Sequence, residues 1–315
     1  MHRKGFCIIL LLALGFLFTG CPGKNTKTDT VVIAEQFGLA YAPLQVLKTR
    51  KDLAEAPEGV KVEWVRTGNA AVIREAMAAD RMDIGFMGIP PFLIGAQGGM
   101  EWKIICGLSR SPLGLVTTRK SVATLADFTS RDRIALPQPG SIQHILLAMQ
   151  ADRELGDPSA LDSLLVTMSH PDGMNALLSG SEITAHFTSP PFLMAELSTP
   201  GCSLVLSGEE AFGGPFTFII GVVNGSSLKT KGEFLHFLLS KLDNACRFLE
   251  EKPAEAAALL ADVYDMPEEE LLQLLNAEGM AYTTDVTGLE KFGGFMHRAG
   301  YLDTSPEIGA LVHRP

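Results

Sequence analysis

The sequence predicts an α/β protein built from two similar lobes that face each other across a cleft. Three observations indicate this fold. Strand-like and helix-like segments alternate along most of the chain. A short stretch with a Pro-Pro pair occurs twice, at residues 85–93 and 187–193. Each copy follows a helical segment, a polar turn and a short apolar strand, which favours a repeated unit over the chance recurrence of three residues.

Length and composition are those of a folded globular protein. The 315 residues suit one large domain or two ordinary ones, and 46% of them are hydrophobic and 20% charged. The formal net charge is −10, although residues 1–20 hold two cations and no acid. Because phosphate binding needs a basic face, this charge argues against a nucleic-acid partner.

Residues 1–20 are typical of a signal peptide. Arg3 and Lys4 precede an apolar run at residues 6–18, which is short for a membrane span. We therefore expect export from the cytoplasm. An uncleaved N-terminal anchor helix is the alternative interpretation.

The residues around Cys21 resemble a bacterial lipobox. Small residues precede this cysteine, although Phe18 stands where leucine is usual. We expect a lipid on Cys21, a flexible tether at residues 21–30 and attachment to the membrane through this lipid. No later segment is apolar enough to span a membrane.

The first half of the chain reads as strands that each lead into a helix or turn. The second strand alternates polar and apolar residues, and proline begins two of the helices. Strands are expected at residues 30–35, 60–65, 83–87 and 102–107. Helices are expected at residues 43–49, 70–79 and 90–95.

The second half restarts the same pattern and ends in helices that begin with proline or acidic residues. Strands are expected at residues 115–118, 133–136, 164–168, 183–187, 203–206 and 216–223. Helices are expected at residues 125–128, 142–155, 173–178, 231–250, 253–264, 267–277 and 289–300, with another opened by the second Pro-Pro pair. Such alternation predicts parallel sheets with helices on both faces.

The turn-rich residues 111–114 and 213–217 are the expected crossings between the lobes. Lobe 1 would then hold residues 31–113 and 217–315, and lobe 2 residues 114–216.

Small polar turns follow most of the predicted strands, and ligands of open sheets bind at the carboxyl ends of strands. Gly68-Asn69 and Gly140-Ser141 are the best candidates, because each lies at a helix N-terminus whose free N–H groups favour an acceptor or anion. They would hold corresponding places in the two halves. Ordinary caps and turns are the alternative interpretation.

Three other side chains have two open interpretations. His144 lies one turn inside a helix and would either orient a ligand or be an ordinary surface or helix-capping histidine. Phe37 and Tyr41 would either stack on a ligand or cover the core. No nucleophile–base pair and no metal-ligand spacing is evident, so binding without catalysis is expected. Cys106 and Cys246 lie in apolar patterns typical of core thiols, and a disulfide at Cys202 has no support.

Several motifs together resemble a known family. They are similar to motifs of the solute-binding proteins of ABC importers for nitrate, sulfonate, taurine and thiamine-pyrimidine precursors. The motifs are EQFGLAYAPLQV, TGNAAVIREAM, DIGFMGIPPFL and the run from GLVTTR through LADF to RIALPQPGSIQHILL. The likeness covers most of residues 31–310. It implies the type II periplasmic-binding-protein fold, with two α/β lobes that close on a solute.

The resemblance also implies a function and a set of ligand contacts. The partners would be a small-molecule solute and the permease of an ABC importer, the protein would be a monomer, and no cofactor is expected. Few arginines near these loops favour a neutral or weakly anionic heterocycle over a sulfonate. Enzymes of the same fold in pyrimidine or menaquinone-precursor biosynthesis are the alternative. The implied pocket residues are Gln36, Gly38, Tyr41, Gly68, Asn69, Gly88, Ile89, Gly140, Ser141, His144 and Ser189, to which the stacking argument adds Phe37.

Overall fold

The computed structural model describes residues 29–313 except residues 58 and 181. The predicted signal peptide, Cys21 and most of the predicted tether lie outside these residues. The tether is predicted to end at residue 30, but the first strand already begins at Asp29. Within the described part of the chain, no helix is both long and apolar enough to cross a bilayer.

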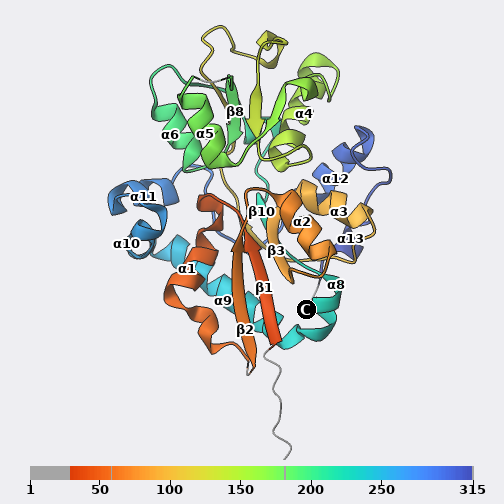
Figure 1. Ribbon diagram of the computed structural model, residues 1–315, viewed down its shortest axis with the longest axis vertical. Helices are drawn as coiled ribbons and strands as arrows, with labels where there is room; N and C mark the ends of the chain where they lie inside the picture. Colours follow the sequence, from red (N-terminus) through yellow and green to blue (C-terminus); the bar gives the residue numbers. More distant parts are fainter. Residues whose placement is uncertain (1–28, 58, 181, 314–315) are drawn as a thin grey trace, which may run out of the picture.

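Two five-stranded sheets form the framework, one in each lobe (Figure 1). The first has the order β2-β1-β3-β10-β4 and the second the order β7-β6-β8-β5-β9. The strands of the first sheet are β1 Asp29–Glu35, β2 Val60–Arg66, β3 Ile84–Gly88, β4 Lys103–Ser109 and β10 Ile219–Val223. Those of the second are β5 Gly114–Thr117, β6 Ile134–Leu136, β7 Leu165–Thr167, β8 Ala185–Thr188 and β9 Ser203–Ser207.

The two sheets have the same arrangement of strands. Strands β1, β2 and β3 occupy the places that β6, β7 and β8 occupy in the second sheet. Strands β1 and β2 run parallel, with Asp29 paired to Val60 at one end and Glu35 paired to Arg66 at the other. Each Pro-Pro pair follows the central strand of its sheet, β3 or β8. The repeat seen in the sequence is therefore a structural one, and the prediction of two α/β lobes is confirmed.

The sheets are mixed, so the prediction of purely parallel sheets is wrong for two strands. Strand β10 is antiparallel to β3 and β4, and β5 is antiparallel to β8 and β9. Both follow segments in which the chain passes from one sheet to the other. A strand that enters its sheet from the other lobe starts at the cleft, whereas the parallel strands end there.

Side-chain caps fix where the helices at the cleft begin. Asn69 accepts hydrogen bonds from the first turn of α2 (Ala70–Ala78), Ser141 from that of α4 (Ile142–Leu155) and Ser169 from that of α5 (His170–Leu178). Helix α3 (Ile89–Gln97) carries both prolines in its first turn. Helix α6 (Phe192–Ser198) begins only after the cis Pro190-Pro191 bond, so the second pair precedes its helix rather than opening it.

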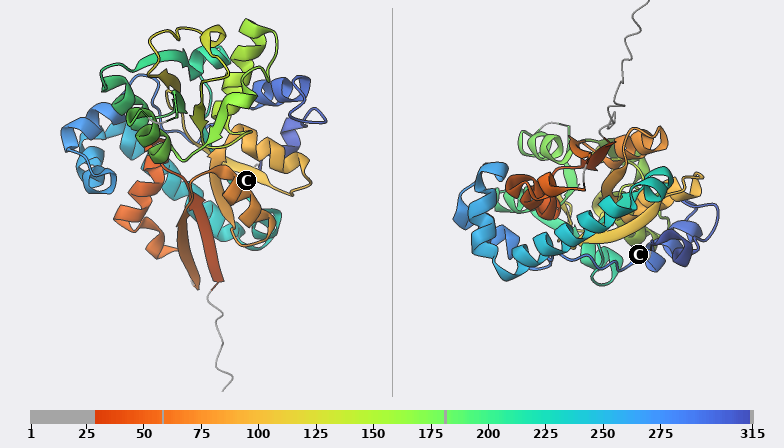
Figure 2. Two further views of the ribbon diagram at one scale, coloured as in Figure 1. Left: turned by 45° about the horizontal axis from the view of Figure 1, so that its top comes forward. Right: turned by 90° about the horizontal axis from the view of Figure 1, so that it is seen from below.

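Helices from the C-terminal part pack beside both lobes (Figure 2). Helix α9 (Gly232–Glu251) packs on α1 (Ala42–Arg50), whereas α12 (Leu289–Arg298) contacts both α3 and α4. The sequence did not predict α7, α8 or α13. The remaining helices are α7 Gly208–Phe212, α8 Gly225–Thr230, α10 Pro253–Tyr264, α11 Glu268–Leu275 and α13 Ile308–Leu311, with 3-10 turns at Leu39–Tyr41, Asp52–Glu55, Leu125–Asp127 and Asp162–Leu164.

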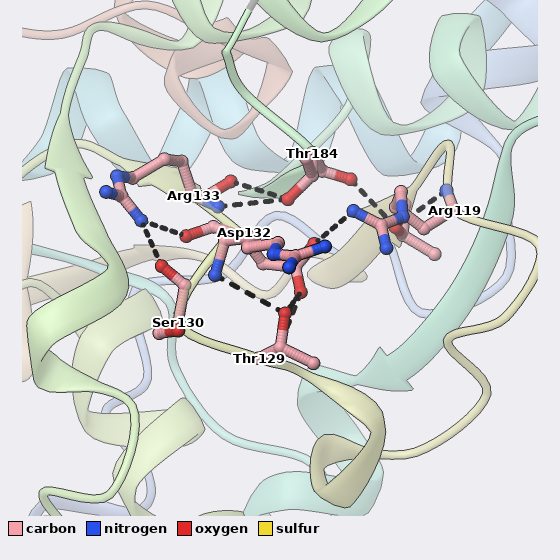
Figure 3. A network of polar contacts seen from close by, with 8 residues as sticks. Arg119, Thr129, Ser130, Asp132, Arg133 and Thr184 are labelled. Carbon is pink, nitrogen blue, oxygen red and sulfur yellow. Dashed lines mark hydrogen bonds and ion pairs between the residues drawn. The ribbon is translucent and has the colours of Figure 1, made fainter.

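A buried carboxylate secures the end of the second sheet that faces away from the cleft (Figure 3). Asp132 accepts hydrogen bonds from Arg119 at 3.0 Å and from the backbone and side chain of Thr129 at 2.9 Å. Burial would raise the pKa of Asp132. The hydrogen bonds from Thr129, a further hydrogen bond from Thr184 and the positive charge of Arg119 together hold the pKa below its ordinary value. The three cysteines among the described residues are free, and Cys106 and Cys246 are buried as expected.

Candidate functional site

A small cavity lies between the two lobes, at the carboxyl ends of the parallel strands. Its volume is about 30 Å³, which is room for roughly two water molecules. Loops from both sheets and the first turns of four helices form its wall. The lining residues are Gln36, Phe37, Tyr41, Gly68, Ala70, Gly88, Pro91, Pro137, Gln138, Ser141, Ile142, Gln143, His170, Phe218 and Ile219.

Direct contacts between the lobes surround this cavity. The backbone N–H of Leu39 donates to the carbonyl oxygen of Pro190 at 3.0 Å, and that of Ala71 donates to Oε1 of Gln138 at 3.0 Å. A Cβ atom on Gly68 would lie 3.6 Å from Cβ of Ser169 in the other lobe. The described structure is therefore a closed form, with the two lobes in direct contact around the cavity.

The structure brings six of the twelve predicted pocket residues to the cavity wall, and the other six do not line it. Gln36, Phe37, Tyr41, Gly68, Gly88 and Ser141 line the cavity. Gly38, Asn69, Ile89, Gly140, His144 and Ser189 do not.

The predicted correspondence between Gly68-Asn69 and Gly140-Ser141 is wrong. Gly68-Asn69 follows β2, whose counterpart is β7, so the residue that matches Asn69 as a helix cap is Ser169. Gly140-Ser141 follows β6 and corresponds to the loop after β1. The two candidates still lie on opposite lobes, as expected.

His144 supports the loop at the start of α4. Its Nδ1 atom accepts a hydrogen bond from the backbone N–H of Gly140 at 2.9 Å, and its Nε2 atom lies 2.9 Å from Oδ1 of Asp162. The ring also packs edge-on against Tyr301. With both nitrogens engaged, His144 holds Gly140 and Ser141 in place from behind the wall.

Two tyrosines hold the loop after β1 in an equivalent way. The hydroxyl of Tyr264 donates to the carbonyl oxygen of Gly38 at 3.5 Å, and that of Tyr282 to Leu39 at 3.2 Å. Gly38 has φ +119°, a conformation that glycine adopts without strain. The loop therefore presents Gln36, Phe37 and Tyr41 to the cavity from a rigid support.

The cations nearest to this loop are bound to a buried carboxylate. Glu35, at the end of β1, accepts hydrogen bonds from Gln45 at 2.6 Å, Lys48 at 2.5 Å and Arg66 at 2.9 Å. The Arg66 guanidinium also lies 5.6 Å from the centre of the Phe37 ring. Neither Lys48 nor Arg66 lines the cavity. Glu35 is thus a structural partner of these side chains.

Two buried polar atoms at the interface of the lobes have no hydrogen-bond partner in the described part of the chain: Nε2 of Gln138 and Oγ of Ser189. Gln138 lines the cavity, and Ser141 and Gln143 in the first turn of α4 line it beside Gln138. The first amides of a helix have no partner within the helix. An unpaired buried donor costs about 1–3 kcal/mol, so an acceptor placed here would bind favourably.

A chain of buried polar side chains leads from the cavity into lobe 2. Nε2 of Gln143 lies 3.1 Å from Nε2 of His170, whose Nδ1 lies 3.3 Å from Nε2 of His186 and 3.2 Å from the Thr188 hydroxyl. Nδ1 of His186 lies 2.6 Å from Oε1 of Glu196. Burial lowers the pKa of His170 well below its ordinary value and that of His186 to about 3, and raises that of Glu196 to about 8.

Sequence reasoning missed Gln138, Gln143, His170 and Phe218 as individual lining residues. Gln138 and His170 follow predicted strands, where polar turns were expected, and Gln143 lies in the first turn of a predicted helix. A strand end shows where a site lies but not which side chain points into it. Phe218 follows from the antiparallel return of β10, which the sequence did not reveal.

The arrangement can bind a small group that accepts several hydrogen bonds, since its polar wall consists of amide, hydroxyl and imidazole groups with helix N-termini. Within residues 29–313 apart from the two gaps, no group of three or more His, Cys, Asp or Glu side chains is placed to hold a metal ion.

Comparison with known proteins places the chain beside sulfonate-binding proteins. It is 26% identical, over 274 residues, to a protein of Bacillus subtilis (strain 168) named for the binding of aliphatic sulfonates, with 84% of this chain and 79% of that protein covered. No protein-family model matches the chain.

Solved structures show the same fold. The alkanesulfonate-binding protein SsuA from Xanthomonas axonopodis pv. citri, bound to MOPS, has a TM-score of 0.75 at 20% identity and covers 91% of this chain and 99% of its own. The periplasmic aliphatic sulphonate binding protein SsuA from Escherichia coli has a TM-score of 0.67 at 17% identity, with 91% and 92% covered. The predicted fold class and the resemblance to importer solute-binding proteins of the sulfonate type are confirmed.

Proposed function

We propose that this chain, which resembles the aliphatic-sulfonate-binding proteins, captures a small aliphatic sulfonate between its lobes and delivers it to the permease of an ABC importer. The observation that carries the proposal is the unpaired Nε2–H of Gln138 beside the first turn of α4, in a cavity that both lobes enclose. A sulfonate offers three acceptor oxygens, which suits a wall of N–H and O–H donors. The sequence alone favoured a heterocycle as the solute, and the similarity to sulfonate-binding proteins is the reason to propose a sulfonate instead.

Neutral donors would bind the anion without a full counter-charge. Helix N-termini stabilise anions because their first N–H groups are free and their dipole is positive at that end. The lining residues contribute no lysine or arginine among those described. The proposed ligand contacts are the predicted residues that line the cavity, together with three that the sequence did not indicate: Gln36, Phe37, Tyr41, Gly68, Gly88 and Ser141, with Gln138, Gln143 and His170.

Entry of a solute would require the lobes to separate, because the closed cavity holds about 30 Å³. The proposed moving bodies are residues 31–113 with 217–315 and residues 114–216, joined near residues 111–114 and 213–217. Hinge closure of this kind is a common response of two-lobed proteins to ligands. The proposal includes an exported monomer with a lipid on Cys21, which keeps it beside the importer.

Binding without turnover is part of the proposal. The sulfonate-binding relatives are named as binding proteins, which supports this choice over an enzyme of cofactor biosynthesis. Catalysis would be revealed by any product that appears when purified protein is incubated with a bound solute and that disappears on substitution of Gln138.

The test is titration calorimetry of the mature chain with methanesulfonate, butanesulfonate, taurine, nitrate, sulfate and small pyrimidines. An alkanesulfonate is expected to bind with one-to-one stoichiometry and to bind more tightly than nitrate or sulfate. Binding of a pyrimidine with no binding of any sulfonate would overturn the solute class. Binding of none of these compounds by a folded protein would overturn the proposal as a whole.

A further inference from the structure

The chain Gln143–His170–His186–Glu196 connects the cavity wall to a carboxyl group that has no contact with solvent. Glu196 and His186 are each 0% exposed, and Oε2 of Glu196 has no hydrogen-bond partner in the described structure. Gly173 makes room for the chain, since a Cβ there would lie 2.6 Å from Nε2 of His186. A titratable chain this deep is not needed to fill the core, because an apolar residue would do so at lower cost.

Two hydrogen-bonding patterns satisfy this chain, because a neutral imidazole has one donor and one acceptor nitrogen. If Glu196 donates to His186, then His186 donates to His170, and His170 carries a hydrogen on Nε2 at the cavity wall. If Glu196 accepts, every bond reverses and Nε2 of His170 becomes an acceptor. The two ends adapt to both patterns, since the Gln143 amide can turn over and the Thr188 hydroxyl can donate or accept.

We propose that protonation of Glu196 decides whether His170 offers a donor or an acceptor to the solute, and thereby makes capture of a sulfonate proton-linked. The proposal rests on the function proposed above. His170 is the residue that touches the solute, and Glu196 acts through His186 as a positioning residue. With Glu196 protonated, Nε2–H of His170 can donate to a sulfonate oxygen in place of the Gln143 amide oxygen, while all four side chains stay neutral.

Among the described residues, burial is the cause that raises the pKa of Glu196, and no cation is paired with it apart from the contact with His186. Strands β5 and β8, which flank it, carry no charged side chain apart from His186. Cys202 lies close enough for its pKa to be raised by burial and by Glu196. On α5, Asp172 is bonded to Ser169 at the surface, and across the cleft burial raises the pKa of Tyr41 well above its ordinary value. The raised pKa values keep the Cys202 thiol and the Tyr41 hydroxyl protonated between pH 7 and 8.

The direction of the linkage follows from the preference of the sulfonate for a donor. The anion binds the form in which Glu196 is protonated, so affinity is constant below the pKa of Glu196, about 8, and falls as the pH rises through it. Between pH 7 and 9 the loss approaches about tenfold if only that form binds. At pH 9, binding takes up close to one proton per sulfonate, and at pH 6 it takes up almost none.

The experiment has one readout that needs no solute and one that does. ¹⁵N NMR of the histidine rings follows which nitrogen of His170 and His186 carries the hydrogen from pH 6 to pH 10. Calorimetry with butanesulfonate, in buffers of different ionisation enthalpy, measures affinity and proton uptake, and butanesulfonate itself does not titrate in this range. The expected result is a change of tautomer in both rings with one midpoint near 8, together with the loss of affinity.

Glu196→Gln keeps the size of the side chain and removes the titration, so it should abolish the tautomer change and flatten affinity between pH 7 and 9. Asp162→Asn is the matched control, since it also replaces a carboxylate by an amide beside a histidine. That histidine, His144, is not part of the hydrogen-bonded series from Gln143 to Glu196. It should keep the pH dependence of the wild type. Tight butanesulfonate binding with a flat pH profile would overturn this inference and leave the proposed function standing. Failure to bind any sulfonate at any pH would overturn both.

Discussion

Oε1 of Gln138, in lobe 2, accepts a hydrogen bond of 3.0 Å from the backbone N–H of Ala71, in lobe 1. The same side chain leaves its Nε2 atom unpaired at the cavity wall. One residue therefore both joins the closed lobes and offers a donor to the solute. This double role makes Gln138 the most informative single position in the proposed site.

Gln138→Ala should weaken binding of butanesulfonate by about tenfold or more, because a hydrogen bond to a charged group is worth about 1.5–3 kcal/mol. The fold should be little affected, since the Ala71 N–H keeps a second acceptor, Oδ1 of Asn69, at 3.0 Å. Calorimetry measures the loss. Gln150→Ala, on α4 and outside the cavity, is the control and should bind as the wild type does. Equal affinities of the two variants would remove Gln138 from the site.

Gly140→Val should abolish the stabilisation by a solute. Gly140 has φ +76°, which a β-branched residue adopts only under strain, and its Cβ would lie 2.6 Å from Cδ1 of Ile94 in the other lobe. The added side chain would thus oppose both the start of α4 and closure of the lobes.

Gly156→Val provides the matched control for that variant. Gly156 ends the same helix with φ +74° and has open space around it, so it imposes similar strain without touching the cleft. Thermal shift with butanesulfonate should therefore stabilise Gly156→Val as much as the wild type, and Gly140→Val much less. If the solute stabilises both variants equally, the cleft assigned here is not the binding site.

The fold could be predicted because its signals are local. Ten strands were expected and ten are present among the described residues, since short apolar runs bounded by turns mark each of them. The short helices α7 and α8 were missed because caps such as Ser207 and Asn224 define them rather than a long apolar stripe. The antiparallel strands were missed because their direction depends on the path of the chain between lobes.

The site was predicted only in part because side-chain direction depends on distant contacts. His144 appeared to be a ligand residue, yet Asp162, eighteen positions later, and the Gly140 N–H turn it away from the cavity. His170 follows a predicted strand, where a polar turn was expected, but its partners Gln143 and His186 come from other elements. No local pattern reveals such pairings.

Asp132→Asn should lower the free energy of unfolding at pH 7 by about 1–3 kcal/mol, because Arg119 and Thr129 would lose a buried anionic acceptor. The pKa of Asp132 is lowered in the folded state, so its contribution is present above the unfolded pKa, about 3.9, and is lost as the pH falls through the folded value. Urea unfolding should show the difference between wild type and variant shrinking below pH 4. Asp152→Asn, exposed on α4, should show no such difference at either pH.

Closure of the lobes should be measurable as compaction in small-angle scattering. Hydrogen bonds from Leu39 to Pro190 and from Ala71 to Gln138 hold the described form closed around a cavity of about 30 Å³. Entry of a solute therefore requires a more open form with a larger radius of gyration. Butanesulfonate should shift the population from the open form to a more compact one, closed around the solute but with a wider cavity than in the described form, because a ligand that contacts both lobes favours closure. The Gly140→Val protein should stay open at saturating solute, while Gly156→Val should close. A radius of gyration that does not change when wild-type protein binds solute would show that the lobes are fixed, and that the solute binds elsewhere on the molecule.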